Sequence, residues 1–158
     1  KFTQQEKDLI SINKEKFFFL FFFFHLKLIN GLDDYLKKAD AAGVKIAIGS
    51  AAILFNVDFV LDGLNIRNYF GSLVSADDVQ KSKPDPETFL KAAAELNVGP
   101  ENCIVFEDAP KGVEAALHAN MKCVVITTMH TKEEFAAYPN VIGFIEDYND
   151  DILNKLLN

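Results

Sequence analysis

The fold of this chain is decided by the stretch C-I-V-F-E-D-A-P-K-G-V-E-A-A-L-H-A-N-M, residues 103–121. Its first four residues form an apolar run of the kind that a buried parallel strand requires. The segment from Pro110 to His118 is predicted to be a helix, because proline is favoured in the first helical turn. A second apolar run follows at 123–126. A strand, a helix and another strand in this order indicate a parallel α/β unit.

The same alternation continues in both directions from this stretch. The apolar spacing predicts strands at 44–48, 70–74, 103–106, 123–126 and 141–145, and helices at 31–42, 56–64, 86–96, 110–118, 132–137 and 151–157. Asn30 is the expected cap of the first helix and Gly43 its stop, and Thr131 with Glu134 forms a capping box. The side chains expected to face inward from two of the helices are Val57, Val60, Leu61, Leu64, Phe89, Leu90, Ala93 and Leu96. The predicted fold class is α/β, a Rossmann-like parallel sheet with helices on both faces.

Composition restricts the classes of partner. The chain has 158 residues and a net charge of −7, which argues against a nucleic-acid surface. An acidic balance still permits phosphate ligands, because local cations or one bound metal reverse the field within a pocket. The two cysteines, Cys103 and Cys123, lie in apolar runs without a C-x-x-C spacing. They are expected to be buried thiols in a reducing compartment, which favours a cytoplasmic location.

The first 28 residues differ in character from the rest. They are helix-prone and polar at first, and they then contain the run F-F-F-L-F-F-F-F at Phe17–Phe24. Eight apolar residues are too few to cross a bilayer, which requires about 20. No small-x-small cleavage site follows the run. Residues 1–28 are therefore expected to form an N-terminal helical segment attached to a core that covers residues 29–158, with no membrane partner.

Polar side chains follow three of the predicted strands. Ser50 comes after the first strand, Lys83 follows the second, and Glu107 with Asp108 ends the third. Ligands bind at the carboxyl ends of parallel strands, so these side chains are expected to converge. Two carboxylates suit Mg²⁺, an ammonium suits phosphate oxygens, and a hydroxyl binds the remaining oxygens. Each residue alone is more typical of a turn, a solvated chain or a helix cap, whereas the set suits phosphoryl transfer.

Three segments resemble the motifs of one enzyme family. G-V-K-I-A-I-G-S, ending at Ser50, is similar to the second motif of haloacid-dehalogenase-like enzymes. Q-K-S-K-P-D-P-E-T-F, which contains Lys83, resembles the third motif. The segment beginning at Cys103 resembles the fourth motif and carries the acidic pair. The sequence between the motifs is similar to that of the β-phosphoglucomutase-like subgroup, and the resemblance covers residues 29–158.

The resemblance implies a function and a role for each motif residue. It implies a Mg²⁺-dependent phosphatase or phosphomutase acting on a small phosphorylated metabolite, specifically a sugar phosphate. Ser50, Ala51 and Lys83 would bind the substrate phosphate, with Ser50 and Lys83 also acting in catalysis. Glu107 and Asp108 would hold the metal.

The sequence departs from the family pattern in two respects. Alanine stands at 109 where the subgroup commonly has serine. The 158 residues also contain no Asp-x-Asp-Gly, the first motif, whose first aspartate is the family's nucleophile. The nearest match, Val60-Leu61-Asp62-Gly63, lies in a helical pattern. Residues 1–28 resemble at most the last helix of a cap domain. The sheet is therefore expected to be incomplete on its N-terminal side and open to self-association, and this chain alone is expected to be inactive.

Two readings of function remain open. In the first, the parent protein is the enzyme described above; in the second, the chain is a truncated, non-catalytic binding or interaction module. An upstream coding segment ending in Asp-x-Asp-Gly would favour the enzyme. A generic nucleotide-binding domain fits less well, because no G-x-G-x-x-G follows a strand. His25 and His118 lack a metal-ligand partner at i+4, and His130 is expected to be a solvated loop residue after a strand. The acidic stretch 146–151 lacks the glycine and glutamate of a calcium loop.

Overall fold

The computed structural model describes residue 3 and residues 26–157. The run Phe17–Phe24, and with it most of the predicted segment 1–28, lies outside the described residues. The α-helices are α2 (Leu32–Ala41), α3 (Leu54–Gly63), α4 (Glu87–Glu95) and α5 (Pro110–His118). The strands are β1 (Ala47–Gly49), β2 (Ser72–Val74), β3 (Ile104–Glu107), β4 (Lys122–Ile126) and β5 (Val141–Ile145). Residues 26–157 also contain the 3₁₀-helices η1 (Arg67–Tyr69), η2 (Ala76–Asp78), η3 (Pro100–Asn102), η4 (Lys132–Phe135) and η5 (Asp151–Lys155).

The strands form two parallel sheets. In one sheet β1 pairs with β2, with Ile48 opposite Leu73. The other has the order β3-β4-β5, and a register irregularity lies between Cys123 and Val124 of β4. Within residues 26–157 no hydrogen-bonded strand joins the two sheets. The predicted parallel α/β class with an incomplete sheet is therefore confirmed for the described chain.

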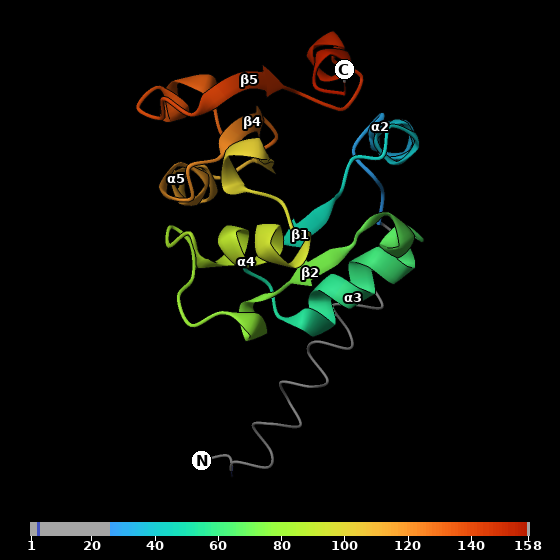
Figure 1. Ribbon diagram of the computed structural model, residues 1–158, viewed down its shortest axis with the longest axis vertical. Helices are drawn as coiled ribbons and strands as arrows, with labels where there is room; N and C mark the ends of the chain where they lie inside the picture. Colours follow the sequence, from blue (N-terminus) through green and yellow to red (C-terminus); the bar gives the residue numbers. More distant parts are fainter. Residues whose placement is uncertain (1–2, 4–25, 158) are drawn as a thin grey trace.

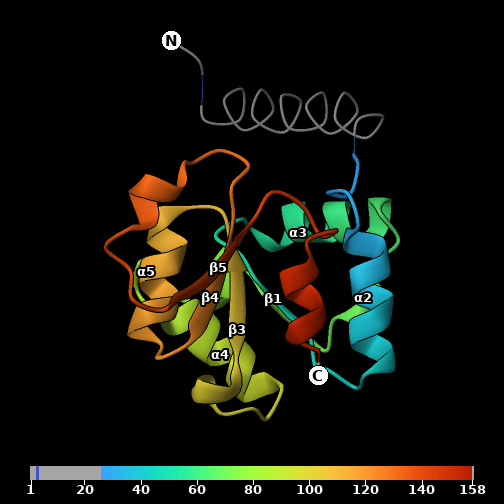
Figure 2. The same cartoon turned by 90° about the horizontal axis from the view of Figure 1, so that it is seen from above.

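Helices cover both faces of the strands (Figures 1 and 2). On one side α4 packs against β1 and β2, while α5 packs against β3 and β4. The core beneath them is centred on the fully buried Val113, Cys123 and Val125. On the other side α2, α3 and η5 enclose two further apolar clusters. None of the helices in residues 26–157 has the length and apolar character that a membrane crossing requires.

Several local predictions are confirmed and others are wrong. The helix 110–118, the strand 141–145, the Gly43 stop at φ 70° and the Thr131 capping box are as predicted. Asn30 does not cap α2, because Gly31 occupies the cap position and the Asn30 carbonyl accepts the Tyr148 amide at 2.8 Å. The predicted helices at 132–137 and 151–157 are short 3₁₀ segments.

Two side chains expected to face the core point outward. Val60 is 38% exposed and Leu90 is 39% exposed. The buried positions are Val57 and Leu61 on α3, and Thr88, Phe89, Ala92 and Ala93 on α4. One residue per turn is buried on α3 and two adjacent residues per turn on α4, and the next residue along a helix is rotated by about 100°. The apolar character of Val60 and Leu90 therefore did not determine their orientation.

Gly31 has two reasons to be glycine, and this generates a stability prediction. Its φ is +78°, and a Cβ built there would lie 2.7 Å from the Tyr148 backbone carbon. Gly43 has a similar φ of +70° but open space around it. Gly43→Ala should therefore cost only the left-handed penalty of about 1–2 kcal/mol, whereas Gly31→Ala should cost clearly more. Urea denaturation measures both variants, and equal losses would show that the 148–149 loop moves away freely.

The two thiols should differ in reactivity. Burial raises the pKa of Cys123 to about 12, with Glu107 adding to the effect. Cys123 is fully buried, whereas Cys103 is partly exposed and its pKa is also raised by burial. Because the thiolate is the nucleophile, Cys123 should resist iodoacetamide at pH 8 until the chain unfolds, and Cys103 should react first. Peptide mapping by mass spectrometry measures both sites, and equal labelling of the native chain would contradict the prediction.

Candidate active site

Glu107 is the last residue of β3, and its carboxylate lies against the first turn of α5. One of its carboxylate oxygens accepts hydrogen bonds from the amides of Asp108, at 3.2 Å, and Ala109, at 3.3 Å. These amides belong to the turn that leads into α5, where backbone N–H groups attract negative charge. The other oxygen accepts from the Lys83 ammonium. The Glu107 side chain is only 10% exposed, so its charge is compensated on both sides.

Gly112 makes this position of the glutamate possible. A Cβ at Gly112 would lie 2.0 Å from the carboxyl carbon of Glu107. The carboxylate therefore occupies the space above the first turn of α5 that a side chain would otherwise fill. The glycine in the sequence K-G-V thus has a packing reason that its position in a helix did not reveal.

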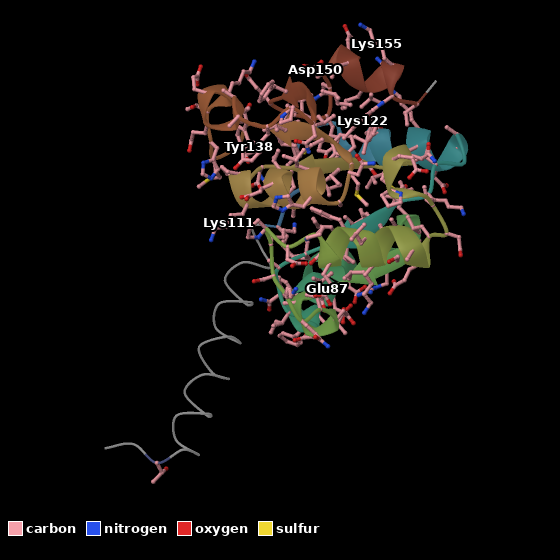
Figure 3. All side chains as sticks on the ribbon, turned by 60° about the vertical axis from the view of Figure 1, so that its left-hand side comes forward. Glu87, Lys111, Lys122, Tyr138, Asp150 and Lys155 are labelled. Atoms are coloured by element: carbon pink, nitrogen blue, oxygen red, sulfur yellow. The ribbon has the colours of Figure 1, made fainter. Side chains whose placement is uncertain are left out.

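Lys83 joins the ends of the two sheets. Its ammonium donates to the Gly49 carbonyl at the end of β1, at 3.1 Å, and to Glu107 at the end of β3. Its side chain is only 12% exposed. The loop that carries it is held from the start of α4, where Glu87 lies (Figure 3). The Glu87 carboxylate accepts the amides of Gln80 at 3.0 Å and Lys81 at 2.9 Å.

Ser50 follows β1 directly, and backbone contacts hold it in place. Its amide donates to the Val74 carbonyl at 2.8 Å, which extends the pairing of β1 with β2. Its hydroxyl oxygen accepts the Ala52 amide at 3.0 Å, so the hydroxyl proton remains to be donated. Asp77 of η2 accepts the amide of Leu54 at 2.8 Å and fixes the end of this loop at α3.

Asp108 lies one residue beyond β3 and is exposed. The Thr128 hydroxyl donates to one of its oxygens at 3.4 Å. Sequence reasoning missed Thr128, although it obeys the rule that led to the other residues, since it follows the end of β4. The loop sequence T-T-M-H-T contains no motif that marks Thr128 as a site residue.

These residues line one open cleft with a volume of about 490 Å³. All five predicted site residues contribute to its wall: Ser50, Ala51, Lys83, Glu107 and Asp108. Thr128 and Lys111 line it as well. The cleft therefore combines cations, carboxylates and a hydroxyl donor at the carboxyl ends of the strands, as an anion site beside a hard-metal site requires.

The carboxylates differ in how well they suit a metal. Asp108 is exposed, and the hydrogen bond that its carboxylate accepts from Thr128 is long at 3.4 Å, so its oxygens suit a hard cation such as Mg²⁺. Glu107 already accepts Lys83 and two amides and is better placed to orient the lysine. No group of three or more histidine, cysteine, aspartate or glutamate side chains meets anywhere within residues 26–157. Mg²⁺ commonly takes only one or two carboxylates alongside water and phosphate, so the donor set is compatible with it.

The remaining candidates belong to other parts of the structure. Asp62, in the nearest match to the first motif, lies in α3 and bonds Arg67 at 2.6 Å, which lowers the pKa of Asp62. His130 contacts Glu134 at 2.9 Å and lowers the pKa of that carboxyl. His118 contacts the Pro84 carbonyl at 3.0 Å.

In the acidic stretch, Asp147 accepts the Asn149 amide as a turn residue does. His25 lies outside the described residues.

Known proteins resemble this chain in sequence and in structure. The family model described as haloacid dehalogenase-like hydrolase matches residues 4–126. The fructose-1-phosphate phosphatase of Escherichia coli is 40% identical over 79 residues, which are 50% of this chain and 42% of that protein. The 5-amino-6-(5-phospho-D-ribitylamino)uracil phosphatase of Arabidopsis thaliana is 30% identical over 130 residues, 82% of this chain and 35% of that protein. The chain thus spans less than half the length of either relative.

A solved structure gives the same assignment. The β-phosphoglucomutase of Clostridium difficile superposes with a TM-score of 0.78 at 26% identity, covering 99% of this chain and 69% of that one. The family match covers well over half of the residues, and the parallel α/β fold agrees with it. On these grounds the chain belongs to the haloacid dehalogenase-like hydrolases.

Proposed function

We propose that this chain is the phosphate- and Mg²⁺-binding part of an enzyme that transfers a phosphoryl group to or from a small sugar phosphate. One observation carries the proposal: the Lys83 ammonium is held between the Gly49 carbonyl and Glu107 in the same cleft as Ser50 and Asp108. The phosphatases and the mutase named above support the reaction class, since each acts on a phosphorylated small molecule by name.

Each residue has a defined task in this proposal. Lys83 offers an N–H to a phosphate oxygen, because an ammonium has three donors and two are used by Gly49 and Glu107. The Ser50 hydroxyl donates to a second oxygen. Asp108, with Glu107 beside it, would hold Mg²⁺, which neutralises phosphate charge when bound. Glu107 fixes the lysine, since an unpaired ammonium at this depth would be costly.

The nucleophile is not among these residues. Glu107 is occupied by Lys83 and two amides, and Asp108 is assigned to the metal. The Ser50 hydroxyl accepts the Ala52 amide and contacts no base in the described structure. By the family pattern an aspartate of an Asp-x-Asp-Gly motif would attack phosphorus, and the 158 residues contain no such motif. The non-catalytic binding module therefore remains the alternative for the chain by itself.

Phosphate binding tests the cation. Isothermal titration calorimetry of the chain with inorganic phosphate, in the presence of Mg²⁺, should show saturable binding. Lys83→Met should abolish it, because the phosphate would lose its charged donor. Lys122→Met is the matched control, since Lys122 is exposed at the opposite end of β4, apart from Lys111 (Figure 3). Because Lys83→Met leaves the Glu107 carboxylate without its cationic partner, the double variant Lys83→Met/Glu107→Gln should show the same loss in a stable fold. Full binding by either variant would contradict the assignment.

Turnover distinguishes the enzyme from the binding module. With Mg²⁺ and a panel of hexose phosphates, the 158-residue chain should release no phosphate and convert no isomer, because a nucleophile must stand about 3–3.5 Å from phosphorus. The same assay on a longer chain that also carries Asp-x-Asp-Gly should give turnover, and Lys83→Met should remove it. Turnover near 1 s⁻¹ from the shorter chain would show that another residue serves as nucleophile. Inactivity of the longer chain would favour the binding module.

A further inference from the structure

The Lys83 ammonium rests on an aromatic ring. Its nitrogen lies 4.4 Å from the ring centroid of Phe89, the third residue of α4. Phe89 is 8% exposed and belongs to the main core cluster, so the contact is shielded from water. A cation over a ring face is attracted by the ring quadrupole, and the attraction grows when water is excluded.

The same ring also touches the end of β1. A Cβ at Gly49 would lie 3.0 Å from Phe89 Cδ1 and 3.1 Å from Cε1, so the ring occupies the space that a side chain there would take. Gly49 is also the residue whose carbonyl accepts the ammonium, at 3.1 Å, and it precedes Ser50. One ring therefore contacts both the lysine and the strand end that presents the hydroxyl.

From these contacts we infer that Phe89 is a positioning residue for Lys83, and through it for the phosphate subsite. The inference rests on the function proposed above. The carbonyl and the carboxylate define the ammonium's position from two strand ends, and the ring supports it from α4. A lysine side chain has a flexible four-carbon stem, and fixing its rotamers costs about 2 kcal/mol of entropy. A third contact therefore narrows the range of positions that the ammonium occupies. An aliphatic side chain of similar size would fill the core but offer no negative face.

A spectroscopic measurement tests the contact without any assay of activity. In the full chain labelled with ¹³C-lysine, the Lys83 ε-methylene signal is the one that disappears in Lys83→Met. The ring current should place it upfield of the other lysines. In Phe89→Leu it should move to the range of solvated lysines, and in Phe89→Tyr it should stay upfield. Phe135→Leu is the matched control, because Phe135 is a buried ring of the same core cluster, at 1% exposure.

Phosphate titration of the same proteins tests the consequence. Phe89→Leu should weaken phosphate binding roughly tenfold, the size expected for loss of a desolvated cation–π contact. Phe89→Tyr should bind within about twofold of the unchanged chain, as should Phe135→Leu. If Phe89→Leu fails to fold, Phe89→Met gives the same comparison with a flexible side chain that fills the space.

Three outcomes would overturn one of the two ideas, and they are distinguishable. A Lys83 signal that ignores Phe89→Leu would show that the ring does not hold the ammonium. A signal that moves while phosphate affinity stays constant would remove the positioning role. An unchanged chain that binds no phosphate, with the Lys83 signal still upfield, would overturn the proposed function while leaving the Phe89 contact in place.

Discussion

The described structure depends on one largely buried lysine side chain. Lys83 donates to the Gly49 carbonyl and to the Glu107 carboxylate, and so connects the end of β1 with the end of β3. Within residues 26–157 no strand hydrogen bonds connect the two sheets, so this charge-assisted contact and the packing of α4 against α5 unite them at the site. A charge at this depth is tolerated only because each partner is fixed by backbone: the carbonyl by its strand, and the carboxylate by two amides before α5.

Two glycines provide the space for this contact. Gly49 leaves room for the Phe89 ring, and Gly112 leaves room for the Glu107 carboxylate. The bridge is therefore enclosed by backbone on both sides, and the cleft opens beside it with Ser50 and Asp108 in its wall. A chain with a net charge of −7 therefore still presents cationic donors in this cleft, because Lys83 and Lys111 line it together with the two carboxylates. The phosphatases that resemble the chain act on ligands that such a subsite suits.

Much of the fold was predictable because strands and helices leave local signals. The helix from Pro110 and the strand at 141–145 were predicted with their observed limits, because proline and an apolar run mark their ends. Inward orientation was less predictable. Val60 and Leu90 are as apolar as their buried neighbours, and only the packing of α3 and α4 decides which residues of each turn meet the sheet. The two C-terminal segments are 3₁₀ because each is too short to repeat an α-helical pattern.

By itself the sequence determined the order of elements, the family and the five predicted residues that line the cleft, since motifs and apolar runs are local features of the sequence. It could not determine how those residues divide the work. That Glu107 holds the lysine while Asp108 stays exposed, and that Thr128 and Phe89 join them, follows from contacts between segments far apart in the chain. Such contacts depend on how sheets and helices pack in three dimensions, so only the tertiary structure decided them.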